Sequence, residues 1–596
     1  MKSPRQLVAL SFLLLAVFYA CRKNNTENHT AQPTPVIPDL TASISASVAG
    51  FVTDETGNPI AFAQVLAGDK QTMTDEYGYF GIAGALLAKT AGLVKVSKTG
   101  LFNGYKTFIP QAGKETFVRV KLLAKTEIGV VDAAAGGTAS TTDGAQVALP
   151  ANGVVLAIGS SPYTGPVHIS ARWIDPSDNS DNQLGMPGDS RGTDSAGYLK
   201  GLQSYSTLAV ELTGNNGQLL QIAPGKTATL TTPIPSPLSA RAPASLSLWS
   251  LNDSSGLWKQ ESTAVKTGNS YTGTVSHFSF WDDAIGAPLV NFTARILDAA
   301  SQPLTNVPVS ITLANMPQNA GYGRYGYTDA NGIVTGEVFA NANLVLNVLT
   351  TCSLPAYSHP FTTTAADIDL GTLTGDLGQN EVTIKGTVTN CSNQPVTSGF
   401  VQTYDNGFYN RIPISNGAFN FTGLACTNTS AQIVVVDNGS NQQNTPVTIT
   451  FVPGLNDLGA LTACGVSTMG SATYTIDGVS TTLIEPTDTI DAYFLTTANI
   501  TATQILTASG HPNTDQQLSF QFDGGTDTGV AHHFSAVYSN GFPGGSASWP
   551  VPVPVHISSY GKIGDFVSGD INCNLIDANN TAIHTFVCTF RVRRFN

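Results

Sequence analysis

Apolar and polar residues alternate along much of this chain in short runs, the pattern of half-buried β-strands. The clearest runs are residues 50–65, 294–309 and 386–401, which align without a gap. Each has a small residue first, then a β-branched residue, Asp or Asn, proline and valine at matching offsets. An Asx turn followed by proline, which needs no N–H at the start of a return strand, predicts a β-hairpin. The threefold repeat therefore predicts related β domains along one chain.

A second shared segment follows each hairpin. Thr74–Phe80 matches Thr328–Val334, while the third copy keeps only Asn416–Phe419. The Asp-x-x-Gly pattern predicts a tight turn, with glycine at the position that needs positive φ. The three copies should therefore fold alike beyond the first hairpin.

The N-terminal residues predict export. Lys2 and Arg5 precede the apolar run Leu7–Ala20, whose fourteen residues are fewer than the ~20 that span a bilayer. We therefore favour a secretory signal over a membrane-spanning anchor. The run ends in Phe18-Tyr19-Ala20-Cys21, which resembles a bacterial lipobox, although phenylalanine stands where leucine is usual. The resemblance implies a lipoprotein acylated at Cys21, and the polar residues after it should form a flexible tether.

We predict an all-β fold of tandem β-sandwich domains, Ig-like or transthyretin-like. The predicted segments are a signal peptide (1–20), a lipidated cysteine and flexible tether (21–43), a first domain (44–125), a larger second domain (126–287), a third (288–377), a fourth (378–465) and a fifth (466–596).

The first domain resembles the carboxypeptidase regulatory-like domain, a sandwich of seven or eight strands. The resemblance rests on Gly50-x-Val52-x-Asp54, Gly57–Ile60 and Thr74–Phe80, and the other two copies match less fully. Such modules are common in Bacteroidetes envelope lipoproteins and beside metallocarboxypeptidases, and the module itself is non-catalytic. Residues 126–287 are similar to β domains of the cartilage intermediate layer type. Together these resemblances imply an envelope protein built from non-catalytic modules.

Four aromatic residues of the second domain admit two interpretations. Trp249, Trp258, Phe278 and Trp281 could form a sugar-stacking platform, but such residues more often fill a sandwich core, and we favour the core.

Composition limits the possible partners. Charged residues make up 12% of the chain, against ~25% in ordinary domains, and the net charge is −13 with no basic block. Nucleic-acid binding is therefore not expected, since it needs clustered Lys and Arg. Low charge with 41% hydrophobic residues also argues against disorder.

The seven cysteines include no C-x-x-C pair, which argues against a zinc ribbon. With Cys21 lipidated, six remain, an even number that suits disulfides in an exported protein. We expect Cys573 to bond Cys588, because both lie on the last two predicted strands. Cys391–Cys426 and Cys352–Cys464 would complete the set, although four cysteines allow three pairings.

Signals for catalysis or cofactor binding are sparse. Gly188–Gly192 matches G-x-S-x-G, but Pro187 precedes it and no helix is predicted after it, so we interpret it as a coincidence. Asp175, Asp178 and Asp181 form a loop whose oxygens would suit Ca²⁺, with a solvated turn as the alternative. We predict no catalytic residue and no cofactor.

These observations predict a non-catalytic, adhesin-like scaffold held in the outer membrane by a lipid anchor, with a glycan or an envelope protein as its partner. The alternatives are an accessory subunit of an outer-membrane complex, or a hydrolase with its site in 126–287 or 466–596. The sequence leaves open which face of the outer membrane carries the protein.

Overall fold

The computed structural model of the chain describes most residues from Ala31 onwards, and the structural statements below concern these residues. The described ranges are 31–178, 185–314, 316, 323–351, 353–375, 377, 380–405, 408–426, 430–485, 488–497, 500–508, 517–523, 532–561, 566–579 and 582–594. Within them no helix has the length and the apolar character needed to cross a membrane.

The predicted all-β fold of tandem sandwich domains is confirmed. The first domain has two sheets, ordered β4-β1-β7 and β3-β2-β5-β6. Alternate side chains of these strands, such as Val65, Phe80 and Val94, are buried between the sheets. The strands are β1 (Ser43–Thr53), β2 (Gln64–Ala67), β3 (Lys70–Met73), β4 (Tyr79–Ala88), β5 (Gly92–Ser97), β6 (Gly104–Phe108) and β7 (Glu115–Lys121).

The third domain repeats this topology, with sheets ordered β24-β21-β27 and β23-β22-β25-β26. As in the first domain, its first strand pairs antiparallel with one neighbour and parallel with the domain's last strand. The strands are β21 (Leu289–Leu297), β22 (Pro308–Leu313), β23 (Gly323–Tyr327), β24 (Ile333–Phe339), β25 (Asn343–Leu349), β26 (Pro355–Thr362) and β27 (Ile368–Thr374).

The fourth domain keeps the three-stranded sheet, β31-β28-β35, and the same parallel pairing of first and last strands. Its second sheet is larger, with order β30-β29-β32-β33-β36 and β34 paired to β32. The strands are β28 (Glu381–Asn390), β29 (Gly399–Asp405), β30 (Phe408–Pro413), β31 (Ala418–Leu424), β32 (Ser430–Asp437), β33 (Gln442–Gln443), β34 (Val447–Thr450), β35 (Gly454–Ala463) and β36 (Val466–Ser467).

The three predicted hairpins form in the same way, so the repeat is structural as well as sequential. In each, the Asx side chain accepts a hydrogen bond from the backbone N–H four residues on, and an isolated bridge joins the strand to the proline. The bridges are Thr53–Pro59, Leu297–Pro303 and Thr389–Pro395.

The predicted glycine turns are also present. Gly78, Gly332 and Gly417 have φ of 71°, 73° and 73°. A Cβ on Gly78 would lie 2.4 Å from the carbonyl oxygen of Val52, so a side chain there would clash as well as strain the backbone.

The second domain is built on one 13-stranded sheet with a short helix, α2 (Ser236–Ser239). It shares a hydrophobic core with the first domain, in which Phe102 and Tyr105 meet Trp249, Trp258 and Phe280. The strands are β8 (Glu127–Asp132), β9 (Gly137–Ser140), β10 (Gln146–Leu149), β11 (Val154–Leu156), β12 (Pro166–Ile174), β13 (Arg191–Thr193), β14 (Leu199–Gly214), β15 (Leu219–Ile222), β16 (Ala228–Pro233), β17 (Ser245–Leu251), β18 (Trp258–Thr267), β19 (Ser270–Val275) and β20 (Phe280–Ala287).

The fifth domain is one nine-stranded sheet that closes on itself through the pairing of β44 with β45. Its interior is filled by apolar side chains, including Phe520, Phe534 and Phe590. The strands are β37 (Ser471–Ile476), β38 (Val479–Ile484), β39 (Thr489–Thr497), β40 (Ile500–Ala508), β41 (Gln517–Asp523), β42 (His532–Ser539), β43 (Ser546–Tyr560), β44 (Phe566–Asp577) and β45 (Ile583–Arg594), with a 3₁₀ turn, η3 (Pro543–Gly545), between β42 and β43.

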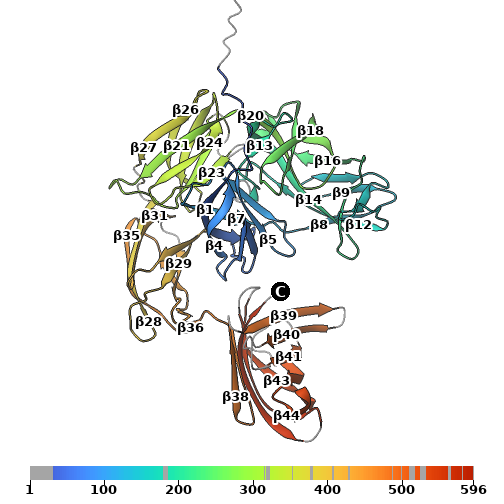
Figure 1. Ribbon diagram of the computed structural model, residues 1–596, viewed down its shortest axis with the longest axis vertical. Helices are drawn as coiled ribbons and strands as arrows, with labels where there is room; N and C mark the ends of the chain where they lie inside the picture. The colour runs from blue at the N-terminus through green and yellow to red at the C-terminus, as the bar shows by residue number, and fades with distance from the viewer. Residues whose placement is uncertain are drawn as a thin grey trace, which may run out of the picture.

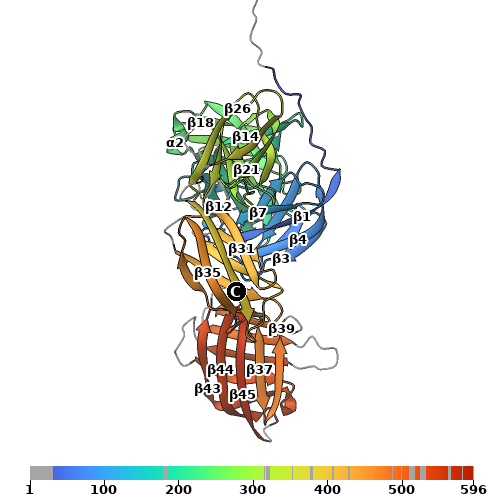
Figure 2. The ribbon, with the colours of Figure 1, turned by 90° about the vertical axis from the view of Figure 1, so that its left-hand side faces the viewer.

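The domains do not follow one another as a simple string. The first domain lies in the middle, against the second, third and fourth, and the fifth lies at one end of the long axis (Figure 1). The described chain begins at the opposite end of that axis (Figure 2).

Part of the predicted flexible tether is ordered, which corrects that expectation for residues 31–42, here called the strap. The side chain of Asn341 donates to the carbonyl of Ala31, the N–H of Leu199 donates to that of Val36, and the hydroxyl of Thr90 donates to that of Asp39. These donors belong to the third, second and first domains, so the strap crosses all three.

The disulfide pairing differs from the prediction. Cys391 bonds Cys464, which excludes the expected Cys391–Cys426 and Cys352–Cys464 pairs. The reason is the parallel pairing of β28 with β35, which places Asn390 beside Ala463 and so brings the next residues together. Cys426 is also disulfide-bonded, and Cys352 lies outside the described residues.

The predicted bond between Cys573 and Cys588 is absent, and both are free thiols. The register pairs Cys573 with Phe586 and Cys588 with Ile571, so the two cysteines are diagonal neighbours. Diagonal Cβ atoms lie farther apart, at up to ~7–8 Å, than the ~3.5–4.5 Å that a disulfide requires. Burial raises the pKa of the Cys573 thiol to about 11.

Replacing Cys391 and Cys464 by serine is expected to lower the free energy of unfolding by about 2–3 kcal/mol, since the bond closes a loop across the fourth domain. Denaturant unfolding under oxidising conditions measures the change. Cys573→Ala, which removes a free thiol, is the control and should have a smaller effect. Equal stability of the double variant and the wild type would contradict the expectation.

Candidate functional site: a cavity between three domains

A buried arginine joins the first three domains. Arg191, on β13 of the second domain, is 1% exposed and forms ion pairs of 2.7 Å with Asp189 and with Glu337 of the third domain. It also donates to the carbonyl of Thr90 in the first domain at 2.9 Å. Burial alone would lower its pKa, but the two carboxylates outweigh burial and raise it. The guanidinium therefore stays charged and holds three domains at one point.

Beside this arginine lies a cavity of about 460 Å³. Its walls come from β6, β7 and the loop between them, from residues 186–190 of the second domain, and from β22, β23, β24 and the turn 328–331 of the third. β6, β7, β23 and β24 each lie at the edge of their sheet. Packing the two domains edge to edge covers these strands and leaves the space between them.

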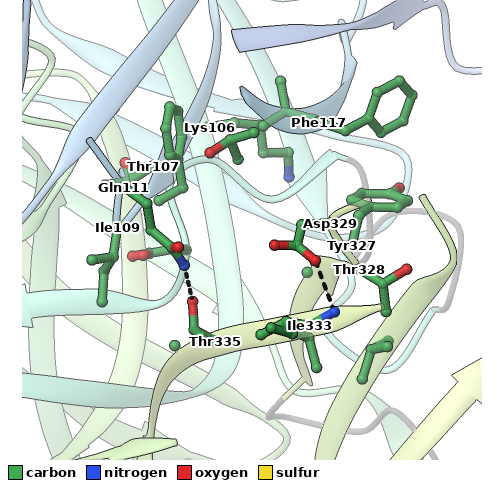
Figure 3. A pocket seen from close by; sticks show the side chains of 18 of the residues that line it. Lys106, Thr107, Ile109, Gln111, Phe117, Tyr327, Thr328, Asp329, Ile333 and Thr335 are labelled. Carbon is green, nitrogen blue, oxygen red and sulfur yellow. Dashed lines mark hydrogen bonds between the residues drawn. The ribbon is translucent and has the colours of Figure 1, made fainter. Parts of the chain in front are cut away.

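Polar contacts fix the walls on both sides. Gln111 donates to the hydroxyl of Thr335 at 3.1 Å (Figure 3). Lys114 forms an ion pair with Asp329 at 3.3 Å. Asp329 also accepts from the N–H of Ile333, which holds the turn of the third domain in place (Figure 3). Burial would raise the pKa of Asp329, but hydrogen bonds from the N–H groups of Ile333 and Asn331 and the nearby Lys114 lower it.

Lys106 extends from β6 into the cavity wall and donates to the carbonyl of Met186 at 2.8 Å. Burial lowers its pKa to about 8, against the opposing effect of Asp189, and nearby Lys121 lowers it further.

Aromatic rings close another side of the cavity. Phe117 and Tyr327 lie edge to face with ring centroids 5.3 Å apart (Figure 3). The guanidinium of Arg119 lies 5.0 Å from the Phe117 ring and 5.7 Å from the Tyr327 ring, and it donates to Asn410 of the fourth domain. This side therefore links the cavity to the fourth domain.

The predicted calcium loop is placed only in part. Asp175 accepts hydrogen bonds from the backbone and the hydroxyl of Ser177, each at 2.7 Å, as in the solvated turn. Asp178 closes that turn by donating its N–H to the carbonyl of Asp175, and Asp181 lies outside the described residues. No cluster of three His, Cys, Asp or Glu side chains suited to a metal occurs in the described part of the chain.

The preferred interpretation of the aromatic residues in the second domain is confirmed. Trp249, Trp258, Phe278 and Trp281 are 2%, 0%, 6% and 1% exposed, so they fill the core and offer no sugar platform.

The residues of the G-x-S-x-G match, all within the described ranges, have a structural role and form no nucleophile turn between a strand and a helix. The match leads into strand β13, and its Arg191 forms the ion pairs described above. A Cβ on Gly192 would lie 2.8 Å from the Trp258 carbonyl oxygen. No sequence pattern predicts this role, because one arginine in a polar loop resembles a solvated side chain.

The cavity thus combines neutralised ion pairs, hydroxyl and amide groups, and apolar rings, an arrangement suited to holding a small molecule.

No family model matches the chain. Cartilage intermediate layer protein 2 of Homo sapiens is 28% identical over 229 residues, covering 37% of this chain and 19% of that protein. The protein of the same name from Mus musculus is 28% identical over 228 residues, covering 36% and 19%. The match thus spans about a fifth of the length of these curated relatives.

Among solved structures, the chain is similar to a minor pilin of Streptococcus agalactiae, with 8% identity, 30% of this chain and 97% of that chain covered, and a TM-score of 0.16. It is also similar to the shaft pilin SpaA of Lactobacillus rhamnosus GG, with 10% identity, coverage of 30% and 99%, and a TM-score of 0.17. At such TM-scores the fold assignment rests on the strand pairing described above.

Proposed function

We propose that the chain is a lipid-anchored protein of the bacterial cell envelope, and that it serves as a rigid, non-catalytic scaffold that binds a glycan or protein partner. The observation that supports the rigid-scaffold part of this proposal is that the first domain is ion-paired to every other domain. The pairs are Glu55–Arg172 with the second, Lys114–Asp329 with the third, Asp75–Arg411 with the fourth and Glu76–Arg593 with the fifth.

Further contacts support a rigid body. The guanidinium of Arg411 lies 3.9 Å from the ring centroid of Tyr79 and 3.7 Å from that of Phe400, where the first domain meets the fourth. Arg593 lies 4.9 Å from the Phe62 ring, where the first meets the fifth. Partly buried, stacked arginines hold a defined geometry better than exposed lysines do, so the domains should move together.

The strap supports a particular orientation. Ten Cα-to-Cα steps lead from Cys21 to Ala31, a reach of at most ~35 Å. An anchor at Cys21 would therefore keep the strap end of the body near the membrane. The fifth domain, at the other end of the long axis, would then face away from it (Figures 1 and 2).

Cys21→Ala is expected to release the protein from bacterial membranes, because acylation at this cysteine supplies the proposed anchor. Fractionation of wild-type and variant cells, followed by detergent extraction of the membranes, measures the change. Cys573→Ala, which leaves the N-terminus intact, should remain with the membranes. Unchanged sedimentation of the Cys21 variant would overturn the anchor.

A further inference from the structure

The geometry points to the cavity between the first three domains as a binding site for a neutral sugar of one or two rings. This inference rests on the proposed binding function and names the ligand class. The cavity volume of about 460 Å³ lies within the range of ~300–1,000 Å³ found for small-molecule sites.

The charges in the walls argue for a neutral ligand. Asp189 and Glu337 are both paired with Arg191, and Asp329 is paired with Lys114. These three carboxylates have cationic partners, and the remaining charged groups of the lining, Lys106, Arg119 and Glu115, carry both signs, so the lining as a whole favours neither an anion nor a cation.

The wall groups that make no hydrogen bond to the protein are complementary to the hydroxyls of a sugar. Within the described residues, no hydrogen bond to the protein is made by the hydroxyls of Thr116, Ser190 and Thr305 or by the side-chain amide of Asn306. The Glu115 carboxylate also lines the cavity without such a partner. Sugar hydroxyls both donate and accept, so they complement hydroxyl, amide and carboxylate groups together.

The apolar part of the wall supplies the other half of sugar recognition. Phe117 and Tyr327 are half-buried and lie side by side (Figure 3), and Ile109 and Ile333 also line the cavity. The C–H face of a pyranose ring packs on such surfaces while its hydroxyls reach the polar groups of the same lining.

The test uses the whole mature chain carrying Cys21→Ala, so that binding is measured without the lipid. Calorimetric titration covers galactose, glucose, mannose, N-acetylglucosamine, lactose and cellobiose, with galacturonate and glucosamine as charged counterparts. We expect at least one neutral sugar to bind with a dissociation constant below about 10 mM, and more tightly than its charged counterpart.

Two cavity variants should weaken that binding at least about ten-fold, because each removes hydrogen-bonding groups. One is the double variant Thr116→Ala/Thr305→Ala. The other is Asn306→Gly, which removes the amide while glycine tolerates the φ of 55° at this position. Thr589→Ala, at an exposed position on β45 in the fifth domain, is the control and should bind as the parent does.

Hydrogen exchange gives a readout independent of the variants, since the bound sugar should protect β7 and the residues around Thr305. The inference is overturned if no neutral sugar binds, if charged counterparts bind more tightly, or if both cavity variants bind like the control. Release of the Cys21 variant from membranes is a separate result, so sugar binding and anchoring can fail independently.

Discussion

Arg191→Met is expected to lower the free energy of unfolding by about 3–5 kcal/mol, because it leaves Asp189 and Glu337 without their shared cation at a nearly buried site. The substitution should lower the stability of all three domains that the guanidinium joins. Chemical denaturation measures the stability, and small-angle X-ray scattering of the native variant should show an enlarged radius of gyration.

The triple variant Arg191→Met/Asp189→Asn/Glu337→Gln should recover part of the loss, since it removes the stranded charges along with the cation. Lys385→Met is the matched control. Its pair with Asp457 has side chains 45% and 53% exposed, so the change should be at most about 1 kcal/mol. A similar loss in the arginine variant and the control would contradict a role for burial.

Stability is expected to fall as pH rises from about 4 to 8, because the second domain buries two neighbouring carboxyl groups. Asp282 and Asp283 are 0% and 2% exposed. Burial raises the pKa of Asp282 to about 7, although hydrogen bonds from Ser204 and Thr207 act in the opposite direction. Burial raises the pKa of Asp283 to about 8, opposed by the hydrogen bond from Thr232 and assisted by Asp282.

Stability falls with rising pH because the folded state holds the protons of these carboxyl groups more tightly than the unfolded state does. The unfolded carboxyls, with an ordinary pKa of 3.8, lose their protons at mildly acidic pH, while the folded ones keep theirs. The folded state thus binds more protons between about pH 4 and pH 8, so stability declines through that window and levels off above it. For Asp282 alone, the free energy of unfolding lost between the acidic and the alkaline end of this window is roughly 4 kcal/mol.

Asp282→Asn/Asp283→Asn should flatten this pH dependence, since amides keep the shape without titrating. Denaturant unfolding from about pH 4 to 8 gives the slope for each protein. Asp143→Asn, at an exposed aspartate in the turn between β9 and β10, should keep the wild-type slope. An unchanged slope in the double variant would show that the two carboxyls are not the source.

The first hairpins of the three repeats were predictable because their contacts are local. Asp54 accepts from the N–H of Asn58, four residues on, and Pro59 bridges back to Thr53, so the turn lies within one short stretch. The disulfide of Cys391 was not predictable in the same way. It depends on a parallel pairing between strands at opposite ends of the domain, which leaves no local signal.

The candidate site was beyond the reach of sequence patterns for the same reason. Thr116 and Thr305 line one cavity from two domains, and each resembles an ordinary surface threonine in its own segment. Arg191 meets Glu337 only because β13 and β24 come together across a domain boundary.

The sequence alone predicts the all-β class, the threefold repeat and the turns, because alternation, Asx residues, proline and glycine act within a few neighbouring positions. It also carries the expectation of a lipid at Cys21. Tertiary packing, in contrast, sets the central place of the first domain, the pairing of Cys391, the path of the strap across three domains and the cavity beside Arg191. Those features depend on the side chains and strand edges that distant segments present to one another, and no local pattern records them.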